Sequence, residues 1–76
     1  MIVWHVTSRK KLLQYLERRM ILPPVRAWKN IKDAERFSIQ TGRQIILRLK
    51  FPDDAPELDG HRKKAVIYNN FYQLNF

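Results

Sequence analysis

The sequence predicts a small α+β domain in which two helices pack on a mainly antiparallel sheet of about four strands. Three observations support this fold class. Short β-branched runs and one alternating run are typical of strands, two segments carry apolar residues at helical spacing, and prolines and glycines separate these elements. The chain has 76 residues, which predicts a single domain over residues 1–76. The expected order of elements is β-α-α-β-β-β.

The first strand is expected at residues 2–6, because valine and isoleucine favour extended backbone there. Thr7 or Ser8 then caps a helix by accepting a backbone amide hydrogen bond. Apolar residues at helical spacing give this helix one stripe, formed by Leu12, Leu13, Leu16 and Met20. The prolines at positions 23 and 24 force an extended connection, so the helix should end near Met20.

A short extended or turn segment at residues 25–28 precedes the second helix. Asn30 is the expected N-cap of this helix, and Asp33 lies near its positive end. Gly42 is a suitable C-terminal stop. The inner stripe of the helix is expected to consist of Ile31, Ala34, Phe37 and Ser38.

The second half of the chain is expected to supply three further strands. Residues 44–51 alternate between an apolar face and a partly basic face, which predicts a half-exposed strand. Residues 52–64 form a loop that is acidic first and basic afterwards. Residues 65–68 form the next strand, and two asparagines at positions 69 and 70 suit a tight hairpin that returns through residues 71–75.

The charge of the chain indicates a polyanionic partner. There are 15 basic and 7 acidic residues, and the net charge is +8. Four of the acids lie in one loop, namely Asp53, Asp54, Glu57 and Asp59. Outside the acidic stretch 53–59 the balance is +12, which favours contact with a nucleic acid or a nucleotide. The alternatives are solubility alone, or an interaction domain for an acidic protein or for the acidic loop of a second copy in a homo-oligomer.

Several other classes are excluded or disfavoured by composition. The chain has no cysteine, which excludes disulfides and thiolate chemistry and favours a cytoplasmic location. No apolar run is long enough for a membrane span, and no signal peptide is recognisable. The two histidines lack metal-ligand spacing, so no metal site is expected, and two glycines are too few for a phosphate-binding glycine loop.

The remaining candidates are basic and aromatic side chains of the kind that contact phosphates and stack on bases. The candidates for nucleic-acid binding are Arg26, Trp28, Lys29, Arg43, Arg48, Lys50, His61, Arg62, Lys63 and Lys64. Each aromatic residue also has a purely structural interpretation. Trp28 would pack against the prolines, and Tyr68 and Tyr72 would be cross-strand partners in the expected hairpin.

A resemblance to a known fold comes from four stretches, "WHVT", "ILPPVRAW", "DAERFS" and "RQIILRLKF". Together, over residues 2–51, they resemble the N-terminal half of ADP-ribosyltransferase-fold proteins. Those enzymes place a histidine on the first strand, and a threonine two positions later, against the ribose of NAD. The resemblance implies that His5 and Thr7 are nucleotide-binding residues, that NAD is a possible cofactor, and that Tyr68 is the candidate for stacking on nicotinamide.

The same family carries a catalytic glutamate on a late strand, and no glutamate follows Glu57 here. The resemblance therefore implies a minimal or inactive relative, and the catalytic residues remain unassigned. If a nucleotide binds, His5 should open onto a cleft that it shares with Thr7 and with Tyr68 or Tyr72. The alternative interpretation is that His5 is an ordinary strand residue with no function.

A second resemblance concerns size, charge and element order, which look like those of ribosome-dependent mRNA-interferase toxins from toxin–antitoxin pairs. The stretch "VRAWKNIKDA" is similar to the start of a helix in some of them. These toxins position RNA with dispersed basic and aromatic side chains. The resemblance implies that phosphates would be held, or protons moved, by Arg43, Arg48, His61, Lys64 and Tyr72.

Overall fold

The computed structural model describes residues 1–75 and confirms the α+β class. The elements are β1 (Ile2–Thr7), α1 (Arg9–Arg18), β2 (Met20–Ile21), β3 (Val25–Trp28), α2 (Ile31–Thr41), β4 (Ile45–Lys50), β5 (Ala65–Tyr68) and β6 (Tyr72–Gln73). Four strands form an antiparallel sheet in the order β4-β1-β3-β5, and β2 pairs with β6 in a separate ribbon. Within residues 1–75, no helix has the length and apolar character that crossing a bilayer requires.

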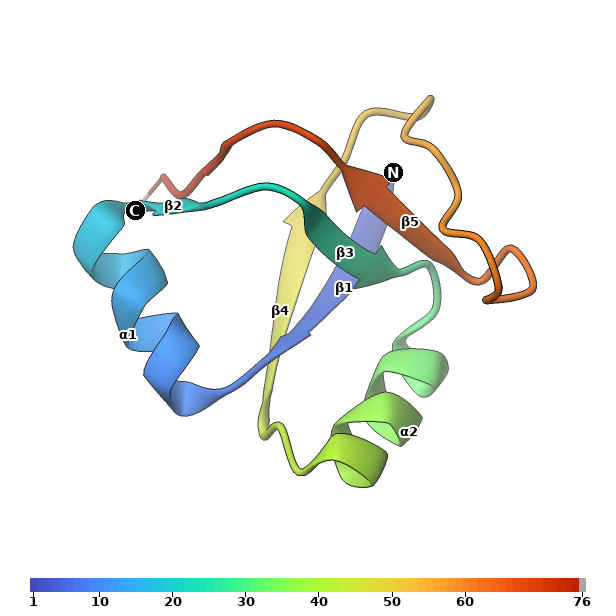
Figure 1. Cartoon of the computed structure of the whole chain (residues 1–76), viewed down its shortest axis with the longest axis horizontal. Helices are drawn as coiled ribbons and strands as arrows, with labels where there is room; N and C mark the ends of the chain where they lie inside the picture. The colour runs from blue at the N-terminus through green and yellow to red at the C-terminus, as the bar shows by residue number, and fades with distance from the viewer. Residues whose placement is uncertain (76) are drawn as a thin grey trace.

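The four-stranded sheet consists of two well-paired ribbons that meet over a short contact. β1 pairs with β4 along its whole length, from Ile2 opposite Lys50 to Thr7 opposite Ile45. β3 pairs with β5 over all four of its residues. Between β1 and β3, however, the register contains only the pair Trp4 and Trp28. In Figure 1, β3 and β5 accordingly run across the direction of β1 and β4.

The hydrophobic core lies at the end of the sheet where both ribbons are closed. Its buried residues come from β1, β2, β3, β4, β5 and the residue after β4, and they are Val3, Ile21, Val25, Ala27, Leu49, Phe51 and Val66. The alternation predicted for residues 44–51 explains part of this core. Leu49 and Phe51 are buried, whereas Arg48 and Lys50, on the other face, are exposed.

The helix boundaries follow the expected capping chemistry. The Ser8 hydroxyl accepts a hydrogen bond from the Lys11 amide at 3.2 Å, and the Asn30 side chain accepts one from the Lys32 amide at 2.9 Å. α2 ends at Gly42, which has a φ of 71° that glycine adopts without strain. α1 ends at Arg18 with Arg19 as its C-cap, close to the expected end near Met20, and Met20 pairs with Gln73.

Residues 25–28, expected as an extended or turn segment, are extended and form the inner strand β3, because β1 and β5 both supply hydrogen-bonding partners. Two expectations about the fold were wrong. Residues 72–73 pair with β2 and do not return along β5 as a hairpin. On α1, Leu13 is 62% exposed and Leu16 is 44% exposed, so the leucine stripe does not face the core. Tyr15 is the residue of α1 that packs against it.

Candidate functional site

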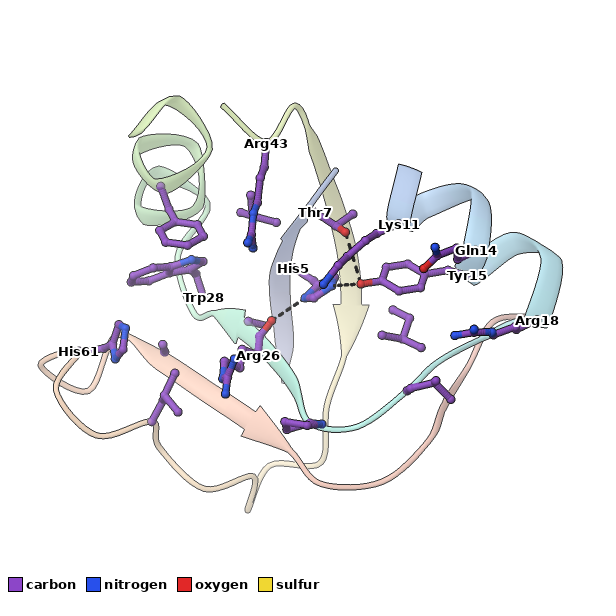
Figure 2. A pocket seen from close by; sticks show the side chains of 18 of the residues that line it. His5, Thr7, Lys11, Gln14, Tyr15, Arg18, Arg26, Trp28, Arg43 and His61 are labelled. Carbon is purple, nitrogen blue, oxygen red and sulfur yellow. Dashed lines mark hydrogen bonds between the residues drawn. The ribbon is translucent and has the colours of Figure 1, made fainter. Parts of the chain in front are cut away.

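A cleft of about 690 Å³ opens where β1 and β3 diverge beyond their single paired position. Figure 2 shows α1 on one side of this cleft and α2 on the other, with the sheet as its floor. α1 contributes Lys11, Gln14, Tyr15 and Arg18, at the three- and four-residue intervals that place side chains on one helix face. The wall opposite α1 includes Phe37, Arg43 and His61.

His5 occupies the floor of the cleft and bridges the two diverging strands. Its Nδ1 lies 2.6 Å from the backbone oxygen of Arg26 on β3. Because a carbonyl oxygen can only accept a hydrogen bond, Nδ1 must carry a hydrogen. In the neutral imidazole Nε2 is then the acceptor, and this atom lies 3.2 Å from the hydroxyl of Tyr15. The Arg26 carbonyl thus fixes both the orientation and the tautomer of His5.

The hydroxyl groups of Tyr15 and Thr7 extend this hydrogen-bonded chain. The Thr7 hydroxyl lies 3.3 Å from the Tyr15 oxygen and donates to it. The Tyr15 hydroxyl then has its own hydrogen available for Nε2 of His5. Thr7 is only 1% exposed, so this bond also satisfies a buried polar group. His5 and Thr7 lie two residues apart on β1 and share a strand face, and both reach the same tyrosine oxygen (Figure 2).

The environment of His5 favours its neutral form. Burial lowers the pKa of His5 below its ordinary value of 6.5, and the nearby positive charges of Lys11 and Arg43 lower it further, against the raising effect of the hydrogen bond to Arg26. A neutral imidazole with an unprotonated Nε2 can accept a proton from a neighbouring hydroxyl. His5 therefore has the position and the protonation state of a general base.

Positive charge gathers on the walls around this group. Among the described residues that line the cleft, the cations are Lys11, Arg18, Arg26 and Arg43. The one carboxylate among those lining residues is Asp59, near the far end. An exposed cluster of cations at a concave surface attracts phosphate groups.

The far end of the cleft is aromatic. The ring of Trp28 lies 5.5 Å from that of Phe37 and 5.6 Å from that of His61, centre to centre. Nδ1 of His61 bonds to the backbone oxygen of Asp59 at 2.9 Å, so it carries the hydrogen and Nε2 is the acceptor of the neutral ring. Trp28 is partly exposed, which leaves part of its surface available for stacking.

The cleft brings together six of the residues that the sequence singled out, namely His5, Thr7, Arg26, Trp28, Arg43 and His61. The other basic candidates lie elsewhere. Lys29 bonds to Glu57 at 2.9 Å, and Lys64 lies 4.0 Å from Asp33. Arg48 and Lys50 occupy the exposed face of β4, and Arg62 and Lys63 form an exposed turn with left-handed backbone.

Tyr68 and Tyr72 do not line the cleft, contrary to expectation. Their rings pack on Phe51 at 5.4 and 6.0 Å, and the Tyr72 hydroxyl accepts a hydrogen bond from the Lys50 amide at 2.9 Å. The tyrosine that joins His5 and Thr7 is Tyr15. A signal for it was present in the sequence, because Lys11, Tyr15 and Arg18 lie on one face of the first helix.

Within residues 1–75, no group of three or more potential metal-ligating side chains comes together. Comparisons of the chain with protein-family models, with curated proteins and with solved structures find no match. The function must therefore be inferred from the cleft itself.

Proposed function

We propose that this chain is a small nucleotide-binding domain whose ligand occupies the cleft between α1 and α2. The observation that carries the proposal is the division of this one cleft into a cationic end and an aromatic end. Lys11 and Arg43 lie beside His5 at the first end, and Trp28 forms the second. A nucleotide has the same two parts, because its phosphates are anionic and its base offers a flat surface for stacking.

The ADP-ribosyltransferase resemblance makes NAD one candidate ligand. It rests on His5 and Thr7, and both residues line the cleft. No glutamate is among the described residues of that lining, and Glu57 is engaged by Lys29. We therefore propose nucleotide binding by a minimal or inactive module of this kind, without ADP-ribosyl transfer.

Calorimetric titration of the protein with NAD, with a nucleoside triphosphate and with a short single-stranded RNA tests the proposal. At least one ligand should bind, with an affinity that falls as salt rises. Arg43→Gln should weaken binding about tenfold or more, since a hydrogen bond to a charged group contributes about 1.5–3 kcal/mol. Arg48→Gln, which removes the same charge outside the cleft, is the matched control. Absence of binding by all three ligands, or equal losses in both variants, would reject the cleft as the site.

A ribonuclease of the toxin type is the second candidate, and the presence of two histidines in one cleft favours it. In this function His5 takes the proton of a ribose 2′-hydroxyl, while the imidazolium form of His61, which carries a hydrogen on Nε2 as well, protonates the leaving oxygen. Of the residues that the toxin resemblance implied, Arg43 and His61 line the cleft. Incubation with labelled single-stranded RNA tests this function, with His61→Gln as the variant. RNA that remains intact with the native protein would exclude it.

A further inference from the structure

Tyr15, His5 and the Arg26 carbonyl have the geometry of an activated nucleophile. The tyrosine hydroxyl lies 3.2 Å from an unprotonated imidazole nitrogen, and a third group holds the other imidazole nitrogen at 2.6 Å. A nucleophile, a base within hydrogen-bond reach and a group that orients the base are the recurring components of covalent catalysis. Nucleotide binding alone gives no role to such a directed chain.

We propose that Tyr15 attacks phosphorus in a phosphoanhydride of the nucleotide bound in the cleft and becomes covalently modified. This inference rests on the proposed nucleotide-binding function. The Tyr15 oxygen forms a bond to phosphorus while its proton passes to Nε2 of His5. The anhydride P–O bond breaks, and the leaving group departs with the electron pair. This group is pyrophosphate when Tyr15 attacks the α-phosphorus of a nucleoside triphosphate, and a nucleoside diphosphate when it attacks the γ-phosphorus. His5 then releases the proton to water, so the balanced products are a phosphorylated or nucleotidylated tyrosine, the leaving group and one proton.

The surroundings of Tyr15 match the charge changes of this step. Lys11, Arg18 and Arg43 line the same cleft and place positive charge where a phosphoanhydride is bound and where its leaving group becomes more negative. A phosphate leaving group needs no added proton at neutral pH, which removes the need for a separate acid.

The hydrogen-bonded chain contains two hydroxyl groups, those of Thr7 and Tyr15, and the Tyr15 hydroxyl is the suitable nucleophile. Thr7 is 1% exposed, and it donates its hydrogen to Tyr15 rather than to the base. Tyr15 lies between Thr7 and His5, with its oxygen directed into the cleft (Figure 2). The Thr7 hydrogen bond therefore positions the Tyr15 oxygen, and its loss would mainly affect the rate of modification.

The experiment is incubation of the full chain with a nucleoside triphosphate labelled at the α- or the γ-phosphorus, followed by denaturation, intact mass measurement and peptide mapping. Label from the α-position indicates a nucleotidyl group, and label from the γ-position indicates a phosphoryl group. Either adduct on Tyr15 supports the proposal. Tyr15→Phe should abolish labelling, whereas Tyr68→Phe, the same chemical change outside the cleft, should leave it intact.

A second variant distinguishes the role of His5 as a base from its structural role in bridging β1 and β3. His5→Asn retains an amide N–H that can reach the Arg26 carbonyl but has no basic nitrogen. The rate of labelling should fall about 100-fold or more, as expected for loss of a general base. Nucleotide binding measured in parallel by calorimetry separates the two hypotheses. Binding without any adduct, or an adduct mapped to another residue, overturns the role of Tyr15 and leaves nucleotide binding standing, whereas no binding rejects the proposed function.

Discussion

The two ends of the four-stranded sheet differ although they share the same strands. Along one face of β1, Val3 is fully buried opposite Leu49, whereas Thr7, four residues later, is buried beside the cleft and bonded to Tyr15. His5 lies between them and bridges to β3. The difference arises where β1 and β3 separate, because a closed sheet brings apolar side chains into contact and an open one leaves room for polar groups.

This contrast assigns different physical roles to the two ends. At the closed end, apolar burial around Phe51 and Val66 supplies stability. At the open end, the polar side chains satisfy one another, and within residues 1–75 no buried side-chain nitrogen or oxygen lacks a hydrogen-bond partner. Because these polar groups are already paired, the cleft costs the protein little folding free energy. Substitution of residues that line the cleft should affect binding and chemistry more than the free energy of unfolding. Four measurements test whether the two ends have these separate roles.

The largest loss of stability is expected at the closed end, from Phe51→Ala. Phe51 is 1% exposed and touches both Tyr68 and Tyr72, so truncation leaves a cavity that the small core cannot fill. The free energy of unfolding should fall by about 3–5 kcal/mol. Denaturation by guanidinium measures it, and Phe51→Leu should cost clearly less. A loss below about 1 kcal/mol for Phe51→Ala would show that this end does not carry the stability.

Tyr15→Phe should cost about 1–2 kcal/mol of unfolding free energy. The substitution keeps the packed ring but leaves the buried Thr7 hydroxyl without its acceptor. Thr7→Val on the Tyr15→Phe background removes that stranded group, so it should recover part of the loss. Tyr68→Phe is the matched control. A double variant that is less stable than Tyr15→Phe alone would contradict the hydrogen bond between these residues.

His5 should make a smaller contribution to the free energy of unfolding, and this contribution should depend on pH. Since burial depresses the pKa of folded His5, the unfolded chain binds this proton at a higher pH than the folded chain does. The contribution of His5 to stability is therefore complete above about pH 6.5 and is lost as the pH falls below it. Thermal unfolding of the native protein and of His5→Asn between about pH 8 and pH 5.5 measures this. His61→Gln is the control, and identical pH slopes for native protein and His5→Asn would refute the assignment.

The smallest effect on stability is expected from Arg43→Gln. Arg43 is exposed and lies among other cations, so its removal relieves repulsion and should change the unfolding free energy by no more than about 0.5 kcal/mol. The same variant should raise the pKa of His5, because Arg43 is one of the charges that lower it. Histidine proton resonances followed by NMR during a pH titration measure that change. An unfolded or strongly destabilised Arg43→Gln protein would contradict the separation between the two ends.

Much of the candidate site could be predicted from local patterns. His5 and Thr7 share a face because strand residues alternate, and Ser8 and Asn30 cap helices because their side chains accept amide hydrogens. The assignment of Tyr68 or Tyr72 to the cleft came from the family resemblance, and no local pattern supported it. The expected hairpin between residues 65–68 and 71–75 was a separate prediction, and it also failed. Two asparagines favour a tight turn, but the pairing of β6 with β2 depends on residues about fifty positions earlier in the chain.

Sequence alone predicts the fold class, the helix caps, the alternation of β4 and the excess of positive charge, since each depends on residues close together in the chain or on composition alone. The inner position of strand 25–28 and the contact between Tyr15 and His5 arise only in the folded chain. Both outcomes require contacts between segments that are distant in the sequence. The free energy of those contacts depends on how the rest of the chain packs around the core. The cleft exists because β1 and β3 are held together at Trp4 and Trp28 and separate beyond that pair, and no local pattern of residues specifies that separation.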